Sequence, residues 1–143
     1  MKLVLQRVLN SSVTIEGIEV SKINNGLLVL FGVEKQDSED MIDFYAQKLL
    51  KLRIFEDENG KMNKSIVDIQ GEILVVSQFT LCADCKKGTR PSFDNAMEPK
   101  RANEFYESFV SVLKNSGLNV QTGQFGADMK VALTNDGPVT IIL

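Results

Sequence analysis

The stretch Gly71–Leu81 reads Gly-Glu-Ile-Leu-Val-Val-Ser-Gln-Phe-Thr-Leu and decides how the rest of the chain is arranged. Its first half holds four consecutive apolar residues, 73–76, which is typical of a central strand buried on both faces. Its second half turns polar in the segment Ser77–Thr80. Polar side chains at the end of a buried strand either have partners in the core or belong to a site. The pattern alone leaves both interpretations open.

Outside this stretch, strand and helix patterns alternate and predict one α/β domain over residues 1–143. The two helical patterns are amphipathic, as expected for helices packed on a mixed sheet. The predicted elements are two strands within residues 3–20 joined at Glu16-Gly17, a buried strand at 26–33, a helix from an N-cap at Asp37-Ser38 to Leu52, a short strand at 53–55, a helix from Pro99 to Gly117, and strands beginning at Val120, Met129 and Val139.

Two segments are predicted to lie outside regular structure. Residues 61–65 resemble an exposed loop. Residues 135–138, Asn-Asp-Gly-Pro, are typical of a turn between two strands, although Pro138 lacks the N–H that a strand needs at its start.

The composition excludes several kinds of chemistry. The chain has 143 residues, a net charge of −3 and no histidine. It therefore cannot use Ser-His-Asp or Cys-His catalysis, a histidine-ligated zinc ion, or histidine as a general acid or base. A reaction must use carboxylates, hydroxyls, a thiol, main-chain amides or groups of the substrate, and we expect no metal and no cofactor.

Charge and hydropathy patterns also limit location and partners. No apolar run approaches the roughly 20 residues of a membrane span, and nothing near the start resembles a signal peptide. We expect a cytoplasmic protein that binds neither membranes nor DNA, because the acidic balance argues against a generic nucleic-acid coat. One basic cluster, Lys86, Lys87 and Arg90, lies in the long segment 82–99. It is either a phosphate-binding loop or a solvated loop.

Cys82 and Cys85 have the Cys-x-x-Cys spacing of redox pairs. Such a pair usually opens a helix, whereas a Gly-Thr-Arg-Pro turn follows here, and the second pair needed for a four-cysteine zinc site is absent. A redox or metal role is the less favoured interpretation.

Arg7 is predicted to point inward, because it alternates with Leu3, Leu5 and Leu9 along one strand. A buried guanidinium needs a carboxylate or several carbonyl oxygens as partners. The alternative is an edge strand from which the side chain reaches water.

Three segments are informative when they are taken in order. They are Ser-Gln-Phe-Thr-Leu at 77–81, Lys-Gly-Thr-Arg-Pro-Ser-Phe at 87–93 and Asn-Asp-Gly-Pro-Val-Thr at 135–140. Together they resemble the D-aminoacyl-tRNA deacylases. Shorter matches lie at residues 7–8, 26–29, 52–55, 60–63 and 122–123. Each motif alone is weak, but the ordered set is specific and covers essentially the whole chain.

The resemblance implies an activity. Members of the family are compact α/β homodimers that hydrolyse the ester between a D-amino acid and the 3′-terminal adenosine of tRNA, which keeps D-residues out of translation. They also act on glycyl-tRNA, including glycine mischarged on alanine tRNA. We therefore expect a homodimer with mixed β-sheets or a barrel-like core, two amphipathic helices, and D-aminoacyl-tRNA and glycyl-tRNA as substrates.

The resemblance also implies the site. Its catalytic residues would be Ser77, Gln78, Phe79 and Thr80. Gly137 and Pro138 would enter from the other subunit with a cis peptide bond, and Arg7 matches the arginine that holds this motif. Lys86, Lys87 and Arg90 are candidates for tRNA contacts.

A mechanism without histidine follows from these assignments. Carbonyl oxygens of Gly137 and Pro138 would accept from the substrate's α-ammonium, and an L side chain would collide with the same backbone. Water, or the ribose 2′-hydroxyl, would assist ester cleavage while main-chain N–H groups near Phe79 and Thr80 stabilise the oxyanion. The competing mechanism uses Thr80 as a covalent nucleophile, although no base is evident.

Two alternative functions belong to other classes. A dimeric RNA-binding module would use the Lys86–Arg90 loop without catalysis. A thiol oxidoreductase would use Cys82 and Cys85.

Overall fold

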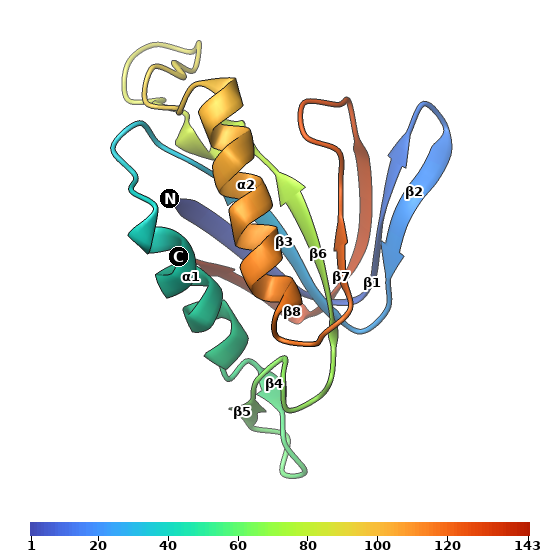
Figure 1. The fold of residues 1–143 in the computed structure, drawn as a ribbon. Helices are drawn as coiled ribbons and strands as arrows, with labels where there is room; N and C mark the ends of the chain where they lie inside the picture. The colour runs from blue at the N-terminus through green and yellow to red at the C-terminus, as the bar shows by residue number, and fades with distance from the viewer.

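Strand β6 (Glu72–Ser77) lies at the centre of the sheet in the computed structural model, which describes residues 1–143 (Figure 1). It runs parallel to β3 (Gly26–Gly32) on one side and to β7 (Val120–Thr122) on the other. All four residues 73–76 are almost completely buried. Alternate side chains enter a large core on the helical side and a smaller cluster on the opposite face. The prediction of a central strand covered on both faces is confirmed.

Strand β1 (Lys2–Ile15) uses both of its edges. One edge pairs antiparallel with β3 and then with β2 (Ile18–Ile23), and the other pairs with β8 (Lys130–Ile142). Because β2 also folds back against β6 and β7, the six-stranded mixed sheet is nearly closed and barrel-like. The β1–β2 turn has positive φ at Glu16 (50°) and Gly17 (80°), as in tight hairpins.

Two helices, α1 (Asp40–Lys51) and α2 (Pro99–Lys114), lie side by side over one face of this sheet (Figure 1). The buried face of α2 supplies Phe105, Phe109 and Leu113 to the large core. Its first turn is fixed by Pro99 and by the Glu98 carboxylate, which accepts from two main-chain N–H groups. Neither helix is both long and apolar enough to cross a lipid bilayer.

Three local predictions are wrong. Helix α1 begins after Glu39, because the Asp37 carboxylate accepts from the N–H of Glu34 and does not cap the helix. Residues 62–64 are not loop but strand β5 (Met62–Lys64), which pairs with β4 (Phe55–Glu56). Leu9 is 53% exposed, because the β1–β8 register shifts around Val8 and breaks the alternation of side chains.

The segment 135–138 is a bulge inside β8, and the prediction of a turn between two strands is also wrong. Gln6 pairs with Thr140, and Val8 pairs with Asn135. An advance of two residues along β1 therefore corresponds to five residues along β8. Strand β1 is long enough to pair with β8 on both sides of this bulge, so the chain keeps its direction. The extra residues of β8 lie opposite Arg7 and do not pair with β1.

Candidate active site

The polar end of β6 leads into a short 3₁₀ turn, η1 (Phe79–Cys82). The N–H of Gln78 donates to the carbonyl oxygen of Phe31 (2.8 Å), which fixes the start of the turn to β3. The first internal bond of the turn runs from the Leu81 N–H to Gln78 O (3.2 Å). The N–H groups of Phe79 and Thr80 precede this bond, and so they lack partners within the turn. The turn therefore presents two adjacent main-chain donors.

The side chain of Thr80 is exposed and has no base beside it. Its hydroxyl oxygen accepts a hydrogen bond from the side-chain amide of Gln78, which is its one partner. An amide does not take a proton at neutral pH. The hydroxyl therefore lacks the adjacent base that activates a nucleophilic threonine.

A cavity of about 640 Å³ opens beside Ser77, Gln78 and Phe79. Twelve of its 18 lining residues are hydrophobic. The lining comes from the end of β3, from β6 and η1, from the start of α2 and the segment before it, and from β8 and the segment before it. Its aromatic and sulfur-containing residues are Phe31, Phe79, Phe93, Met97, Phe125 and Met129. Apart from Phe79, sequence reasoning missed all of them, because they come from segments that meet only in the fold.

The other predicted site residues do not line this cavity. Thr80 lies just outside it, and the basic residues at 86, 87 and 90 are on an exposed loop. Arg7 and the Gly137-Pro138 motif lie on β1 and β8, away from the cavity lining. One chain thus keeps the Gly-Pro motif separate from its own cavity.

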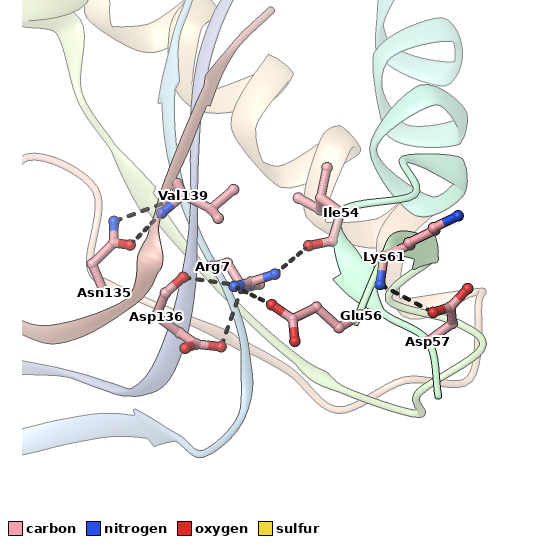
Figure 2. A network of polar contacts seen from close by, with 8 residues as sticks. All are labelled: Arg7, Ile54, Glu56, Asp57, Lys61, Asn135, Asp136 and Val139. Atoms are coloured by element: carbon pink, nitrogen blue, oxygen red, sulfur yellow. Dashed lines mark hydrogen bonds and ion pairs between the residues drawn. The ribbon is translucent and has the colours of Figure 1, made fainter. Parts of the chain in front are cut away.

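Arg7 holds the β8 bulge through a buried guanidinium, which Figure 2 shows at the centre of a polar network. The side chain donates from Nε to Asp136 O (3.0 Å) and from Nη1 to Ile54 O (2.8 Å). Carboxylate oxygens of Asp136 and Glu56 lie 3.2 and 3.7 Å from guanidinium nitrogens. Arg7 is only 4% exposed. The prediction that it points inward and has carbonyl and carboxylate partners is confirmed.

The bulge itself is closely fitted. The Gly137-Pro138 peptide bond is cis, as the resemblance implied. Gly137 has φ of +129°, and a Cβ atom there would lie 2.8 Å from Val139 Cγ2 and 3.1 Å from Arg7 Nη2. The Asn135 side chain closes the bulge by accepting from the Val139 N–H (2.7 Å) and donating to Val139 O (3.3 Å). Only glycine fits at 137.

Sequence reasoning did not assign roles to Asn135, Ile54 or Glu56. The position of Asn135 in the Asn-Asp-Gly-Pro motif was a usable signal, because asparagine side chains often bond to the backbone of a turn. Ile54 and Glu56 gave no such signal, because their contacts with the Arg7 side chain arise only in the folded chain.

The two cysteines differ in a way that argues against redox catalysis. The Cys82 thiol is buried and donates to Val33 O (3.4 Å), and burial, with a smaller contribution from Glu34, raises its pKa. Cys85 is exposed, and both thiols are free. Reactive cysteine pairs need an accessible thiol of low pKa. The Cys82 thiol is neither accessible nor of low pKa.

We expect iodoacetamide to alkylate Cys85 quickly and Cys82 only after unfolding, because a buried, protonated thiol reacts slowly. Mass spectrometry of labelled protein, with and without denaturant, measures this. A Cys85→Ser variant is the control and should stay unlabelled while folded. Rapid labelling at Cys82 in the folded protein would contradict the structure.

Comparisons with known proteins place this chain in a class. A family model described as D-Tyr-tRNA(Tyr) deacylase matches residues 4–143. The chain is 56% identical to a D-aminoacyl-tRNA deacylase of Thermosipho africanus and 57% identical to one of Clostridioides difficile, with 100% of this chain and 96% of each relative covered.

Solved structures share the fold. A structure titled c-Myc DNA Unwinding Element Binding Protein has a TM-score of 0.94 and 46% identity, covering 100% of this chain and 97% of that one. A structure of a probable eukaryotic D-amino acid tRNA deacylase has a TM-score of 0.84 at 17% identity, with coverages of 99% and 97%. The fold and the curated relatives define an enzyme of the deacylase class, a hydrolase. The chain belongs to the D-Tyr-tRNA(Tyr) deacylase family.

Proposed function

We propose that the protein hydrolyses the ester bond of D-aminoacyl-tRNA and of glycyl-tRNA, including glycine mischarged on alanine tRNA, as translation quality control in the cytoplasm. One observation on the residues of this chain supports the proposal most directly. The two unpartnered N–H groups of Phe79 and Thr80 lie beside a mainly apolar cavity, in a protein without histidine. Such a site can stabilise an oxyanion with main-chain atoms alone.

The cavity receives the aminoacylated terminal adenosine, whose base suits an aromatic and methionine-rich wall. The oxygen of a water molecule bonds to the ester carbonyl carbon, and the resulting oxyanion accepts from the N–H groups of Phe79 and Thr80. The bond from the carbonyl carbon to the ribose oxygen then breaks. The proton lost by the water reaches that leaving oxygen, with the neighbouring 2′-hydroxyl as the relay. No metal or cofactor takes part.

A second copy of the chain completes the site. Since the Gly137-Pro138 motif does not line the cavity of its own chain, a homodimer brings the partner's motif to the cavity. Strand β8 supports this arrangement, because it pairs with β1 on one edge only and exposes Ile142 (76%) and Leu133 (37%). A free strand edge with exposed apolar side chains is a surface suited to association.

The motif acts as a chiral gate. Its carbonyl oxygens accept from the α-ammonium of the substrate, and its rigid backbone occupies the space that an L side chain would need. Arg7, Asn135 and the crowding around Gly137 hold this backbone in place. Glycine has no side chain for the gate to exclude, which explains glycyl-tRNA as a substrate.

Replacing Thr80 with alanine distinguishes the two mechanisms. We expect kcat within about threefold of wild type, because the main-chain N–H remains and the hydroxyl has no base to activate it. Loss of a covalent nucleophile typically lowers kcat by about 10⁴-fold or more. Single-turnover hydrolysis of D-tyrosyl-tRNA measures the difference, and a collapse of turnover would establish the nucleophile mechanism instead.

The rival function, a nucleic-acid-binding module without catalysis, has one specific observation in its favour: the solved relative whose title names a DNA element. Incubating the protein with D-tyrosyl-tRNA and following both ester loss and complex formation separates the two. We expect catalytic ester loss well above the uncatalysed rate. Retention of the intact ester in a stable complex would favour the binding module and contradict the proposal.

A further inference from the structure

Two aromatic rings stand at the mouth of the cavity with large parts of their surface in contact with solvent. Phe79 is 60% exposed and Phe93 is 37% exposed, and their rings make an edge contact with centroids 5.0 Å apart and an interplanar angle of 63°. Both rings also line the cavity. An exposed aromatic pair beside a binding site is unusual enough to suggest a ligand for the rings themselves.

The basic loop is anchored next to this pair. Asp84 and Ser92 exchange two main-chain hydrogen bonds (2.8 and 3.0 Å), so residues 85–91 form a closed loop whose base adjoins Phe93. The Asp84 carboxylate accepts from the N–H of Lys86 (2.9 Å), which orders the start of the loop. Lys86, Lys87 and Arg90 are exposed, and none of them forms an ion pair with a carboxylate.

We propose that Phe79 and Phe93 form a stacking platform for the base of the nucleotide that precedes the terminal adenosine, with the basic loop binding its phosphate. Unpaired cations beside exposed aromatic rings are the combination by which proteins bind single-stranded nucleic acid, and any base can stack. The platform deepens the proposed function and rests on it: the cavity holds the terminal aminoacyl-adenosine, and the platform holds its neighbour.

Because the chain has no tryptophan, a Phe93→Trp variant carries a single fluorescent reporter at the platform. The probes are two non-hydrolysable conjugates in which a D-amino acid is amide-linked to the 3′ end of a trinucleotide whose last residue is adenosine. One has a cytosine before the terminal adenosine, and the other has an abasic sugar there. We expect the cytosine conjugate to quench the tryptophan emission strongly and the abasic conjugate to quench it much less. Equal quenching, or none with either conjugate, would overturn the platform.

A matched control exists on α1. Phe44 is 60% exposed, contacts Tyr45 edge to face at 5.3 Å and has the Lys48 ammonium 5.7 Å from its ring centre, but it lies away from the cavity. A Phe44→Trp variant should show no difference between the two conjugates. A similar difference there would mean nonspecific stacking.

Kinetics supply a second readout that separates this proposal from the proposed function. We expect Phe93→Leu to lower kcat/KM for D-aminoacyl-tRNA roughly 5- to 50-fold more than it lowers kcat/KM for a D-aminoacyl-adenosine, mainly through KM. Phe93→Tyr should restore the activity. Equal losses on both substrates would overturn the platform alone, whereas a wild-type protein inactive on both would overturn the proposed function.

Discussion

A lysine in place of Arg7 is expected to lower kcat/KM for D-aminoacyl-tRNA by about 100-fold, because a displacement of roughly 1 Å in a positioning group costs that much. The guanidinium reaches Asp136 O and Ile54 O at the same time, in two directions set by its planar fork. An ammonium group can satisfy only one of these acceptors well. The link that Arg7 makes between the β8 bulge and Ile54 would then be lost, and the proposed gate would be held less firmly.

Stability should fall much less than activity. The buried Ile54 carbonyl would lose its donor, which costs on the order of 1–3 kcal/mol. The carboxylate partners contribute little, because Asp136 is 40% exposed and Glu56 is 58% exposed. Hydrolysis of D-tyrosyl-tRNA and urea unfolding measure the two effects separately.

Arg53 provides the matched control for this variant. It is an exposed arginine just before β4, and its Nε donates to the carbonyl oxygen of Asn63 in β5 (2.8 Å). Arg53→Lys should leave both activity and stability close to wild type. If Arg7→Lys behaved like this control, the guanidinium would not be what holds the gate.

Substituting alanine for Gly137 should reduce discrimination between D- and L-aminoacyl-tRNA by tenfold or more, about 1.4 kcal/mol of selectivity. The added Cβ would approach Val139 Cγ2 to 2.8 Å and Arg7 Nη2 to 3.1 Å, at a φ of +129° that L-residues rarely adopt. Strain of this kind costs on the order of 1–3 kcal/mol locally, and a shift of the bulge relieves it. The gate would then leave room for an L side chain.

Gly17 is the control that distinguishes the steric effect of an added Cβ from the general effect of replacing a glycine. It also has positive φ (+80°), but nothing lies within 4 Å of the position that its Cβ would take. Gly17→Ala should lower stability slightly and leave the ratio of D to L hydrolysis rates unchanged. Unaltered rejection of L-tyrosyl-tRNA by Gly137→Ala would contradict the chiral-gate proposal.

Much of the architecture could be predicted from apolar periodicity. The buried run 73–76, the strand at 26–32 and the two amphipathic helices each have a local pattern that the fold preserves. The N-cap of α1 and strand β5 could not be predicted in the same way. Asp37 bonds back to Glu34 instead of capping, and β5 exists only because β4 pairs with it.

Part of the candidate site could likewise be predicted from local sequence patterns, and part could not. Ser77–Thr80 and Arg7 carry local signals, namely polar residues ending a buried strand and a cation alternating with leucines. The bulge at 135–138 resembles a turn in sequence, and only its pairing with β1 on both sides keeps it within one strand. No local sequence pattern predicts the cavity lining, because Phe31, Phe93 and Phe125 come together only in the folded chain.

Two inactive variants, co-expressed in one cell with different affinity tags, test most directly whether two chains share each site. In the proposed dimer, Arg7→Lys would impair the gate that a chain supplies, whereas Ala127→Trp would fill the cavity that a chain supplies. In a mixed dimer, one site would combine an intact cavity with an intact gate. We predict that the co-expressed pool recovers about a quarter of wild-type D-tyrosyl-tRNA hydrolysis, as random pairing into two-fold dimers requires. Activity no higher than that of the separate variants would show that each chain works alone and would contradict the shared site.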